Sequence, residues 1–413
     1  MGETTDSAEY VAPVDVQMIR EAAERIDGTA LRTPLVASHS LAERFGCEVW
    51  LKLENLQRTG SFKVRGAYNR LLRLTPGEKE RGVVAASAGN HAQGVAFAAA
   101  KLGIPATVVM PRQAPLTKRV ATERLGARVE LAGDSFDDAF AAAERIAGEQ
   151  GKTLIHAFAD PLVIAGQGTV GLEIGEELPD FDLALVPVGG GGLAVGVATA
   201  LRAVNPGARI VGVQAANAPG AYQLFRGEEP VPGTSRATLA DGLAVKRPTA
   251  LTIEPLRRLL DDLVLVTEDE LAAAILFYLE REHVVVEGAG AATLAAFAQE
   301  RVRAGARRAV LVVSGGNIDV NRVARIIDRG LYQEGRYLRL GTNLSDNPGA
   351  LRDFLGVIAD GGGNILTVAH DRIDAAIPVG ETRVAVTVEV RDRAHGAELM
   401  GRLQAAGFQA DRA

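Results

Sequence analysis

The feature that most constrains the fold is the alternation of short apolar segments with Ala-rich helical segments along most of the chain. The apolar segments lack polar residues at alternate positions, a pattern typical of parallel strands that helices cover on both faces. We therefore expect an open α/β fold, in which ligands bind beyond the carboxyl ends of the strands. The predicted strands cover residues 48–54, 82–87, 106–111, 128–133, 183–188, 209–214, 263–267 and 309–314.

The pattern changes near residue 337, where the order becomes strand, helix, strand, strand, helix, with a short last strand at Phe408. This split βαβ order predicts a separate ferredoxin-like domain over residues 337–413. We expect the α/β region to span 15–330 and a linker to occupy 331–336. The polar, acidic residues 1–14 are predicted to form a disordered tail, with no signal or transit peptide.

Composition excludes several classes of protein. The 413 residues carry a net charge of −6, which argues against a nucleic-acid or anionic-membrane partner. Cys47 is the only cysteine, so no intrachain disulfide can form. The uncharged run 183–201 is long enough to span a membrane, but Pro187 and four glycines in its first half indicate a strand followed by a helix. We expect a cytoplasmic protein.

A glycine-rich loop follows the predicted strand 183–188. Gly189, Gly190, Gly191 and Gly192 let the backbone approach a ligand closely and point N–H groups at an anion, beside a helix N-terminus. The alternative is a flexible turn, which four glycines would order at a large entropic cost. Gln214 stands where a dinucleotide site needs an acidic residue, and no Lys-Ser/Thr pair follows the glycines. A compact phosphomonoester therefore fits best.

A phosphomonoester cofactor that works with a lysine amine suggests pyridoxal phosphate. The chain has only seven lysines. Lys63 stands out, because it opens an apolar helical segment directly after Phe62, where a desolvated amine with a lowered pKa is expected. On spacing alone, a surface helix lysine is an equal alternative, and Lys246 is undecided. The others fit solvated positions: Lys52, Lys79, Lys101, Lys118 and Lys152.

Four motifs together resemble one enzyme family. GSFKVRGA (60–67), SAGNHAQGVA (87–96), GGGGL (189–193) and SGGN (314–317) occur in the order found in the threonine/serine dehydratase branch of the fold-type-II pyridoxal-phosphate enzymes. NLSDNPGALRDFL and GGGNILTVAHDR resemble an ACT domain, a small module that binds amino acids. The combination resembles threonine dehydratases (threonine ammonia-lyases) with one ACT domain. It implies two open twisted α/β lobes, the smaller one (roughly 51–160) inserted in the larger.

The resemblance also implies roles for single residues. Lys63 would form the Schiff base and remove the Cα proton, and Phe62 would pack near the cofactor ring. Asn90 would bond the cofactor's 3′ oxygen, Ser314 would face the pyridine nitrogen, and the phosphate would lie on Gly189, Gly190, Gly191, Gly192 and Leu193. The substrate carboxylate would lie on Ser87, Ala88, Gly89, Asn90 and His91.

Each role has a structural alternative that the sequence leaves open. Ser87 and Asn90 could be helix N-caps, and His91 is a better structural histidine than an acid–base group. Ser314 could be an ordinary turn residue. Glu287 could cap its helix or line the cofactor pocket. Asp241 is a weak candidate for a cation site, because no further carboxylate stands close by in sequence.

The implied reaction is β-elimination, which converts L-threonine to 2-oxobutanoate and L-serine to pyruvate, with release of ammonia. Racemases of this family carry a serine where this chain has Ala88, so dehydration is favoured over racemisation. The alternatives are a serine racemase or serine dehydratase, a β-replacement enzyme such as a cysteine synthase, and a non-catalytic amino-acid sensor. Isoleucine, opposed by valine, would bind the ACT loops at Asn347, Pro348, Gly349 and Asn364. The resemblance favours a homotetramer or homodimer.

Overall fold

The computed structural model describes residues 12–231, 233, 235–373 and 377–412. The chain forms two compact units, 1–318 and 319–413, and each is described separately. Residues 1–11 of the predicted tail lie outside the described residues. Val14, at the end of that predicted tail, is 1% exposed and belongs to the core of the first unit.

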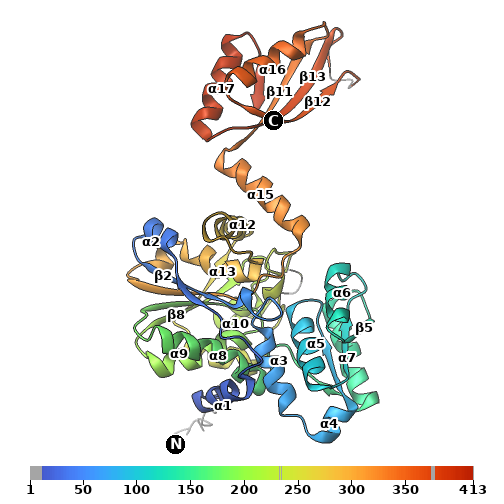
Figure 1. Cartoon of the computed structure of the whole chain (residues 1–413), viewed down its shortest axis with the longest axis vertical. Helices are drawn as coiled ribbons and strands as arrows, with labels where there is room; N and C mark the ends of the chain where they lie inside the picture. The colour runs from blue at the N-terminus through green and yellow to red at the C-terminus, as the bar shows by residue number, and fades with distance from the viewer. Residues whose placement is uncertain (1–11, 232, 234, 374–376, 413) are drawn as a thin grey trace, which may run out of the picture. The chain divides into compact units, whose positions relative to one another are not determined.

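A six-stranded sheet forms the centre of the larger lobe, with strand order β1-β2-β10-β7-β8-β9 (Figure 1). All neighbouring strands run parallel except β1, which pairs antiparallel with β2 at one edge. The strands are β1 (Leu35–Ala37), β2 (Glu48–Leu53), β7 (Leu183–Pro187), β8 (Arg209–Ala215), β9 (Asp262–Val266) and β10 (Arg308–Val313).

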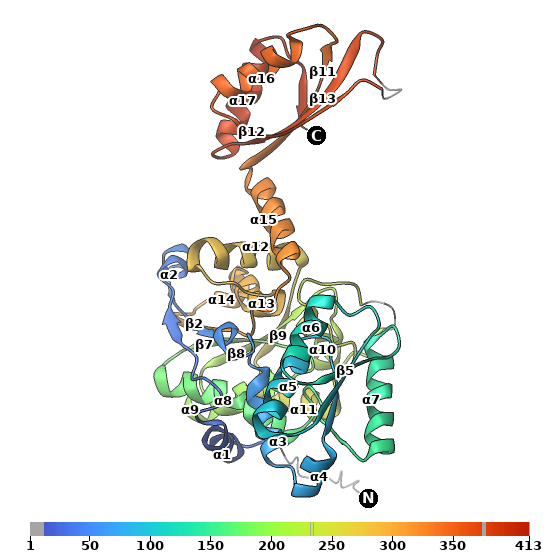
Figure 2. The same cartoon turned by 45° about the vertical axis from the view of Figure 1, so that its right-hand side comes forward.

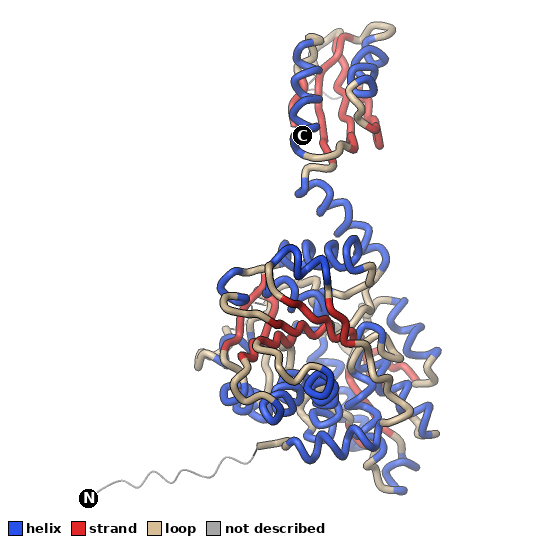
Figure 3. The backbone as a smooth tube through the Cα atoms, turned by 60° about the vertical axis from the view of Figure 1, so that its left-hand side comes forward, coloured by secondary structure: helices blue, strands red, loops and turns tan. Residues whose placement is uncertain are grey.

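Helices cover both faces of this sheet, as Figure 3 shows for the strands drawn in red. Helices α1, α8, α9 and α11 share one apolar core with the sheet, while α13 packs on the opposite face and α12 packs on α13. The helices of this lobe are α1 (Val16–Ile26), α2 (His39–Phe45), α8 (Pro161–Glu177), α9 (Gly192–Val204), α10 (Gly220–Phe225), α11 (Ala250–Leu259), α12 (Glu268–Phe277), α13 (Gly288–Phe297) and α14 (Glu300–Arg303). Three short helical turns are η1 (Glu54–Leu56), η2 (Asp241–Leu243) and η3 (Tyr278–Glu282).

The smaller lobe has a parallel four-stranded sheet with the order β5-β4-β3-β6. Helices α3 and α5 pack on one face and α7 on the other (Figure 2). Its strands are β3 (Val83–Ala86), β4 (Ala106–Met110), β5 (Arg128–Leu131) and β6 (Thr153–Leu154). Its helices are α3 (Lys63–Leu72), α4 (Pro76–Arg81), α5 (Asn90–Leu102), α6 (Leu116–Arg124) and α7 (Phe136–Gln150).

All eight predicted strands are present to within two residues at each end, and the expected α/β fold is confirmed. The run 183–201 forms β7 and most of α9, as predicted. Among the described residues, no helix combines the length and apolar character needed to cross a membrane. The sequence analysis missed β1 and β6, which have only three and two residues.

The second unit has the predicted ferredoxin-like order of elements, with a four-stranded antiparallel sheet ordered β12-β13-β11-β14. Its core lies between this sheet and two helices, α16 and α17. The elements are α15 (Val320–Glu334), β11 (Tyr337–Ser345), α16 (Ala350–Asp360), β12 (Asn364–Asp371), β13 (Glu381–Glu389), α17 (Arg393–Ala405) and β14 (Ala410–Arg412). This sheet is consistent with an ACT-like domain.

The boundary between the units differs from the predicted one. The second unit begins at Asp319, and residues 331–334, which we expected in a linker, are the last turn of α15. Gly335 ends that helix with a left-handed φ of 76°, and only Arg336 then precedes β11. The apolar residues of 320–334 recur at helical spacing, a signal that the glycines at 330 and 335 obscured.

Candidate active site

The residues of the candidate site gather at the carboxyl ends of adjacent parallel strands. In the larger sheet, η1 and α3 follow β2, Ser314 follows β10, and the glycine loop follows β7. In the smaller sheet, the loop 87–90 follows β3. Such strand ends are where open α/β sheets hold ligands, so the predicted positions meet the expected geometry.

Lys63 is the first residue of α3, as predicted. Its Nζ donates a hydrogen bond to the carbonyl oxygen of Ala157 at 2.9 Å and lies 5.1 Å from the centroid of the Phe62 ring. Burial lowers the pKa of this amine to about 8, and the charge of Glu287 opposes that shift. About a tenth of the Lys63 amine is therefore an uncharged nucleophile at pH 7, far more than at an ordinary lysine pKa of about 10.4.

The other lysines separate into surface and buried groups. Lys52, which we expected in a solvated position, is completely buried and pairs with Glu173 at 2.6 Å, so that prediction was wrong. Lys246 forms an exposed ion pair with Asp137. Lys63 remains the lysine that combines a partly buried amine with a position beside the glycine loop.

The four glycines each need to be glycine, for separate reasons. A Cβ atom on Gly189 would lie 2.8 Å from the carbonyl oxygen of Gly242, and one on Gly190 would lie 2.2 Å from the Phe158 ring. A Cβ on Gly192 would lie 2.8 Å from the Phe158 carbonyl oxygen, and Gly191 has a φ of 93°. Packing therefore determines this loop, and a flexible turn does not describe it.

The same loop presents free donors for an anion. Gly191 is the N-cap of α9 and no side chain caps this helix, so its first backbone N–H groups are available to a ligand. Leu193, in the first turn, is 6% exposed. Phe158 closes one side of the loop, and the neighbouring Ala157 receives the Lys63 hydrogen bond. The segment 157–158 thus joins the lysine to the glycine loop.

Asn90 connects the two lobes across the site. Its Nδ2 donates to Glu287 Oε1 at 2.6 Å, and its Oδ1 accepts from Asn317 Nδ2 at 2.8 Å. Asn317 also donates to the carbonyl oxygen of Thr59. The sequence analysis gave Asn317 no role, although it ends the SGGN motif. Its place directly after a strand carboxyl end was the available signal.

Glu287 is the N-cap residue of α13, but its side chain makes no capping bond and turns toward Asn90. It is 4% exposed. Burial raises the pKa of this carboxyl to about 8, and the nearby charge of Asp241 raises it further, while Asn90, Lys118 and Lys63 act in the opposite direction. Of the two alternatives open for Glu287, the structure supports a pocket position.

The segment 87–91 is held by side-chain contacts to the backbone. Ser87 Oγ accepts the N–H of Gly89 at 3.1 Å, and Gly89 is the N-cap of α5, so neither Ser87 nor Asn90 caps the helix. His91 is 3% exposed, and its Nε2 bonds the carbonyl oxygen of Ile155. Burial, aided by the charge of Lys63, lowers the pKa of His91 to about 3, so the ring is neutral at physiological pH.

Two other predicted residues lie at the edge of this site. Ser314 is 2% exposed at the end of β10, and its carbonyl oxygen accepts the N–H of Phe62. Asp241 lies in η2 and pairs with Lys118 of the smaller lobe at 2.7 Å. No cluster of three His, Cys, Asp or Glu side chains suited to a metal ion occurs among the described residues. The carboxylate of Asp241 is thus paired with the ammonium group of Lys118.

The predicted effector residues do not come together within one chain. Asn347, Pro348 and Gly349 lie between β11 and α16, beyond Ser345, which pairs with Glu381. Asn364 begins β12 and pairs with Glu389, which also pairs with Tyr337 at the start of β11. The register therefore places Asn364 at the opposite end of the sheet from the other three residues.

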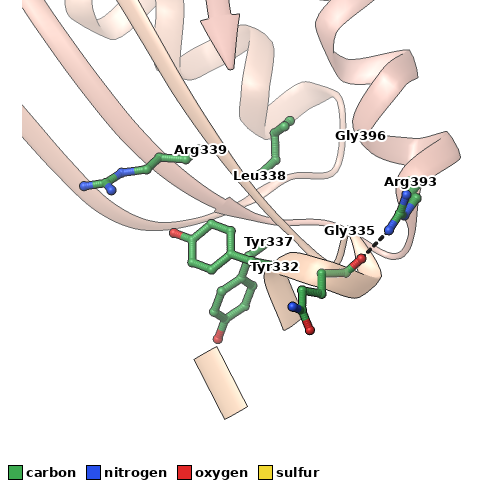
Figure 4. Close-up of a pocket in the computed structure, with 8 residues that line it drawn as sticks. Tyr332, Gly335, Tyr337, Leu338, Arg339, Arg393 and Gly396 are labelled. Carbon is green, nitrogen blue, oxygen red and sulfur yellow. Dashed lines mark hydrogen bonds between the residues drawn. The ribbon is translucent and has the colours of Figure 1, made fainter. Parts of the chain in front are cut away.

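A cavity of about 420 Å³ lies within the second unit (Figure 4). The rings of Tyr332 and Tyr337 meet edge to face there, 5.4 Å apart, and Arg393 Nη2 donates to the carbonyl oxygen of Gln333. The predicted effector residues are absent from its described lining: Tyr332, Gln333, Gly335, Tyr337, Leu338, Arg339, Arg393 and Gly396.

The residues present fit pyridoxal phosphate. The glycine loop is a cradle that side chains would fill, the lysine amine is nucleophilic, and the buried Ser61 Oγ beside Phe62 has no hydrogen-bond partner. Lys63 would hold the cofactor covalently, residues 189–193 would hold its phosphate, and Asn90 and Ser314 would lie beside its ring.

Comparison with known proteins identifies the family of this chain. Residues 26–315 match the family model described as "Pyridoxal-phosphate dependent enzyme". An L-threonine ammonia-lyase from Thermotoga maritima is 47% identical over 396 residues, which are 96% of this chain and 98% of that protein. The Escherichia coli K12 protein named L-threonine dehydratase catabolic TdcB is 47% identical over 319 residues, which are 77% of this chain and 97% of that protein.

Solved structures give the same result. Maize serine racemase superposes with a TM-score of 0.72 and 35% identity, over 79% of this chain and all of that one. The processed threonine deaminase isoform 2 of Solanum lycopersicum has a TM-score of 0.70 and 36% identity, over 76% of this chain and 94% of that one. This chain therefore belongs to the pyridoxal-phosphate dependent enzyme family of fold type II.

Proposed function

We propose that this chain is a threonine ammonia-lyase, which converts L-threonine to 2-oxobutanoate and ammonia and L-serine to pyruvate and ammonia. The observation that carries the proposal is the Lys63 amine, which has a pKa near 8 and bonds the segment that also packs on the glycine loop. Relatives that share 47% of its residues bear this activity in their names.

When bound, pyridoxal phosphate supplies an electron sink for the charge that develops at Cα of an amino acid. Lys63 then acts as the general base, since its uncharged Nζ can take the Cα proton. Loss of this proton and of the β-hydroxyl removes one water from threonine. Hydrolysis returns a water, so the net products are 2-oxobutanoate and ammonia.

The loop 87–91 is the proposed site of the substrate carboxylate. It runs from the end of β3 into the first turn of α5, whose start carries no side-chain cap, so backbone N–H groups can bind the two carboxylate oxygens. His91 is neutral and fixed to Ile155, which suits it to shape this loop and makes it a poor proton donor. Substrate binding and proton removal then fall to separate groups, the loop and Lys63.

Ala88 favours elimination over racemisation. A racemase needs a second acid–base group on the face of the substrate opposite the lysine, and a methyl group cannot transfer a proton. The two histidines near Lys63, the buried His91 and the partly buried His156, do not replace it. Burial lowers the pKa of His156 to about 4, as it lowers that of His91 to about 3, so neither ring is an acid near neutral pH.

The decisive experiment measures keto-acid formation from L-threonine and L-serine by the purified protein, together with any D-serine. We expect 2-oxobutanoate and pyruvate as the main products, with Lys63→Ala losing both the activity and the visible absorbance of the bound cofactor. Efficient formation of D-serine with little pyruvate would instead identify a racemase. A chain that binds amino acids but forms no product would be a sensor.

We also propose that the second unit is an ACT domain that places the enzyme under amino-acid control, with isoleucine as inhibitor and valine as its antagonist. Because Asn364 and Asn347 lie at opposite ends of the sheet, one effector can touch both only across an interface between two copies. Activity and thermal stability with and without each amino acid test this. If neither amino acid changes the activity or the thermal stability, the second unit would serve only in association between copies of the chain.

Two further expectations accompany this proposal. A homodimer or homotetramer is predicted, and sedimentation of the holoenzyme distinguishes the two. The cytoplasmic location stays a prediction, which the fractionation of producing cells can test.

A further inference from the structure

Four charged side chains form a cluster beside the first turn of α3, which begins at Lys63. We call it the Arg65 cluster, and its members are Lys52 of β2, Glu54 of η1, Arg65 of α3 and Glu173 of α8. Lys52 and Glu54 are completely buried, Arg65 is 1% exposed, and Glu173 is 13% exposed. The two positive and two negative charges balance. A balanced, buried cluster that links a strand, a turn and two helices fixes their relative positions.

Arg65 is the centre of the cluster. Its Nε and Nη2 donate to the two oxygens of Glu54, each at 2.8 Å. Its Nη1 and Nη2 donate to the two oxygens of Glu173 at 2.6 and 2.9 Å. Nη1 also donates to Thr169, and Nη2 to the carbonyl oxygen of Leu31. These six acceptors use all five N–H groups of the guanidinium, and one N–H of Nη2 is shared between two of its three acceptors. A lysine cannot reproduce this planar fork of donors.

Lys63 and Arg65 stand two positions apart in the first turn of α3. Successive helical residues turn by about 100°, so these two side chains leave the helix on nearly opposite sides. Lys63 points toward Ala157 in the site, and Arg65 points into the cluster. Whatever holds Arg65 also sets the direction in which Lys63 leaves the helix.

The first turn of α3 lacks a capping side chain, so it depends on other contacts. Gln167 Oε1 of α8 accepts the N–H of Gly66, and Gly66 lies against Gly166 with no room for a Cβ atom on either. These contacts hold the turn against α8. The two carboxylate oxygens of Glu54, which directly follows β2, accept hydrogen bonds from Arg65 and so hold this turn against the larger sheet.

We propose that Arg65 is a positioning residue for Lys63, which it aims at the cofactor by fastening the first turn of α3 to Glu54 and Glu173. This inference rests on the proposed function for its assay. It assigns no catalytic contact to Arg65. A displacement of about 1 Å at a reacting group is enough to cost on the order of a hundredfold in rate, so a loosened turn has a measurable consequence.

The test compares Arg65→Lys with a matched control in the same helix, Arg70→Lys, in the holoenzyme. Arg70 pairs at 2.8 Å with Asp160, the N-cap residue of α8, and so also ties α3 to the start of that helix, but it lies at the far end of α3 from Lys63. For each variant, borohydride reduction and mass spectrometry give the fraction of chains with cofactor attached to Lys63. The kcat and KM for L-threonine are then expressed per attached cofactor.

For Arg65→Lys we expect a fall in kcat of at least tenfold per attached cofactor, a KM within threefold of the unchanged chain, and a smaller attached fraction. Arg70→Lys should change kcat less than twofold. An unchanged kcat in Arg65→Lys, or an equal fall in both variants, overturns the proposal. If Arg65→Lys does not fold, Thr169→Val decides, since it removes one hydrogen bond from Arg65 and should lower kcat two- to threefold.

The attached fraction also separates this inference from the proposed function. If the unchanged chain attaches cofactor but does not act on L-threonine, the proposed function fails, and the attached fractions of the variants still test the role of Arg65. If the unchanged chain is active and Arg65→Lys matches it in both measurements, only the positioning role fails.

Discussion

Glu287 is buried and Lys63 partly buried, and their pKa values have moved toward each other, to about 8 in both cases. Burial raises the pKa of the carboxyl and lowers that of the amine, because it disfavours the charged form of each. Between about pH 4.5 and 8, Glu287 therefore keeps its proton in the folded chain, whereas the same carboxyl is ionised in the unfolded chain. Folding stability from this group declines as the pH rises through that window.

Glu287→Gln should remove this decline. Glutamine keeps an oxygen that can accept from Asn90 Nδ2, so the contact between the lobes survives. Relative to the unchanged chain, the variant should gain stability between pH 5 and 8, by up to about 1.4 kcal/mol for each pKa unit of displacement removed. Thermal unfolding of cofactor-free protein across this pH range measures the effect.

The control for this experiment is Glu254→Gln, which changes an exposed carboxyl of α11. Its unfolding curve should follow that of the unchanged chain at every pH. If the Glu287→Gln and control curves run parallel between pH 5 and 8, the displaced pKa of Glu287 is contradicted.

The environment of a residue could be predicted from the sequence where its partners lie nearby in the chain, and could not where they lie far away. Lys63 could be made a candidate because its helix start and the neighbouring Phe62 are local features, and the resemblance of the motifs then selected it. Lys52 could not be placed, because its burial depends on Glu173 of a distant helix. The same limit applies to Asp241, whose partner Lys118 belongs to the other lobe.

At the scale of elements, α3 and α8 cross with almost no space between their backbones. A Cβ atom on Gly66 would lie 2.5 Å from the Val163 carbonyl oxygen and from Gln167 Nε2, so alanine there must displace a helix. We expect Gly66→Ala to destabilise the fold by about 1–3 kcal/mol through overpacking. Chemical denaturation measures this, with a lower yield of attached cofactor as the functional sign.

Gly148→Ala is the matched control, because this glycine lies in the exposed part of α7 and its Cβ would meet nothing within 4 Å. It should stabilise the fold by about 0.5–1 kcal/mol, since alanine is the better helix former. A Gly66→Ala chain as stable as this control would show that the helix crossing can relax.

The same difference between local and distant interactions separates the strands that could be predicted from those that could not. Strands β3, β7 and β10 could be predicted because each is a continuous apolar run. β1 has an exposed Val36 and exists through its antiparallel pairing with β2, a contact that no local pattern encodes. Likewise, the effector residues could be proposed singly, but the register that separates Asn364 from Asn347 is a property of the folded sheet.

At the scale of the whole molecule, all the candidate active-site residues, from Phe62 to Asn317, belong to the first unit. Residues 26–315, which match the family model, also lie within this unit. The second unit has its own core between α16, α17 and its sheet. Catalysis and control are therefore expected to be separable.

A chain that ends at Glu334 tests this separation. It keeps α15 and leaves Asn317 far from the new carboxyl terminus, but it loses the sheet and both helices of the proposed ACT domain. We expect its kcat/KM for L-threonine to stay within threefold of the full chain, while its response to isoleucine disappears. Assays of both chains over a range of isoleucine concentrations measure this. Loss of activity without isoleucine would show that the first unit needs the second to function, and a retained response would place the effector site in the first unit.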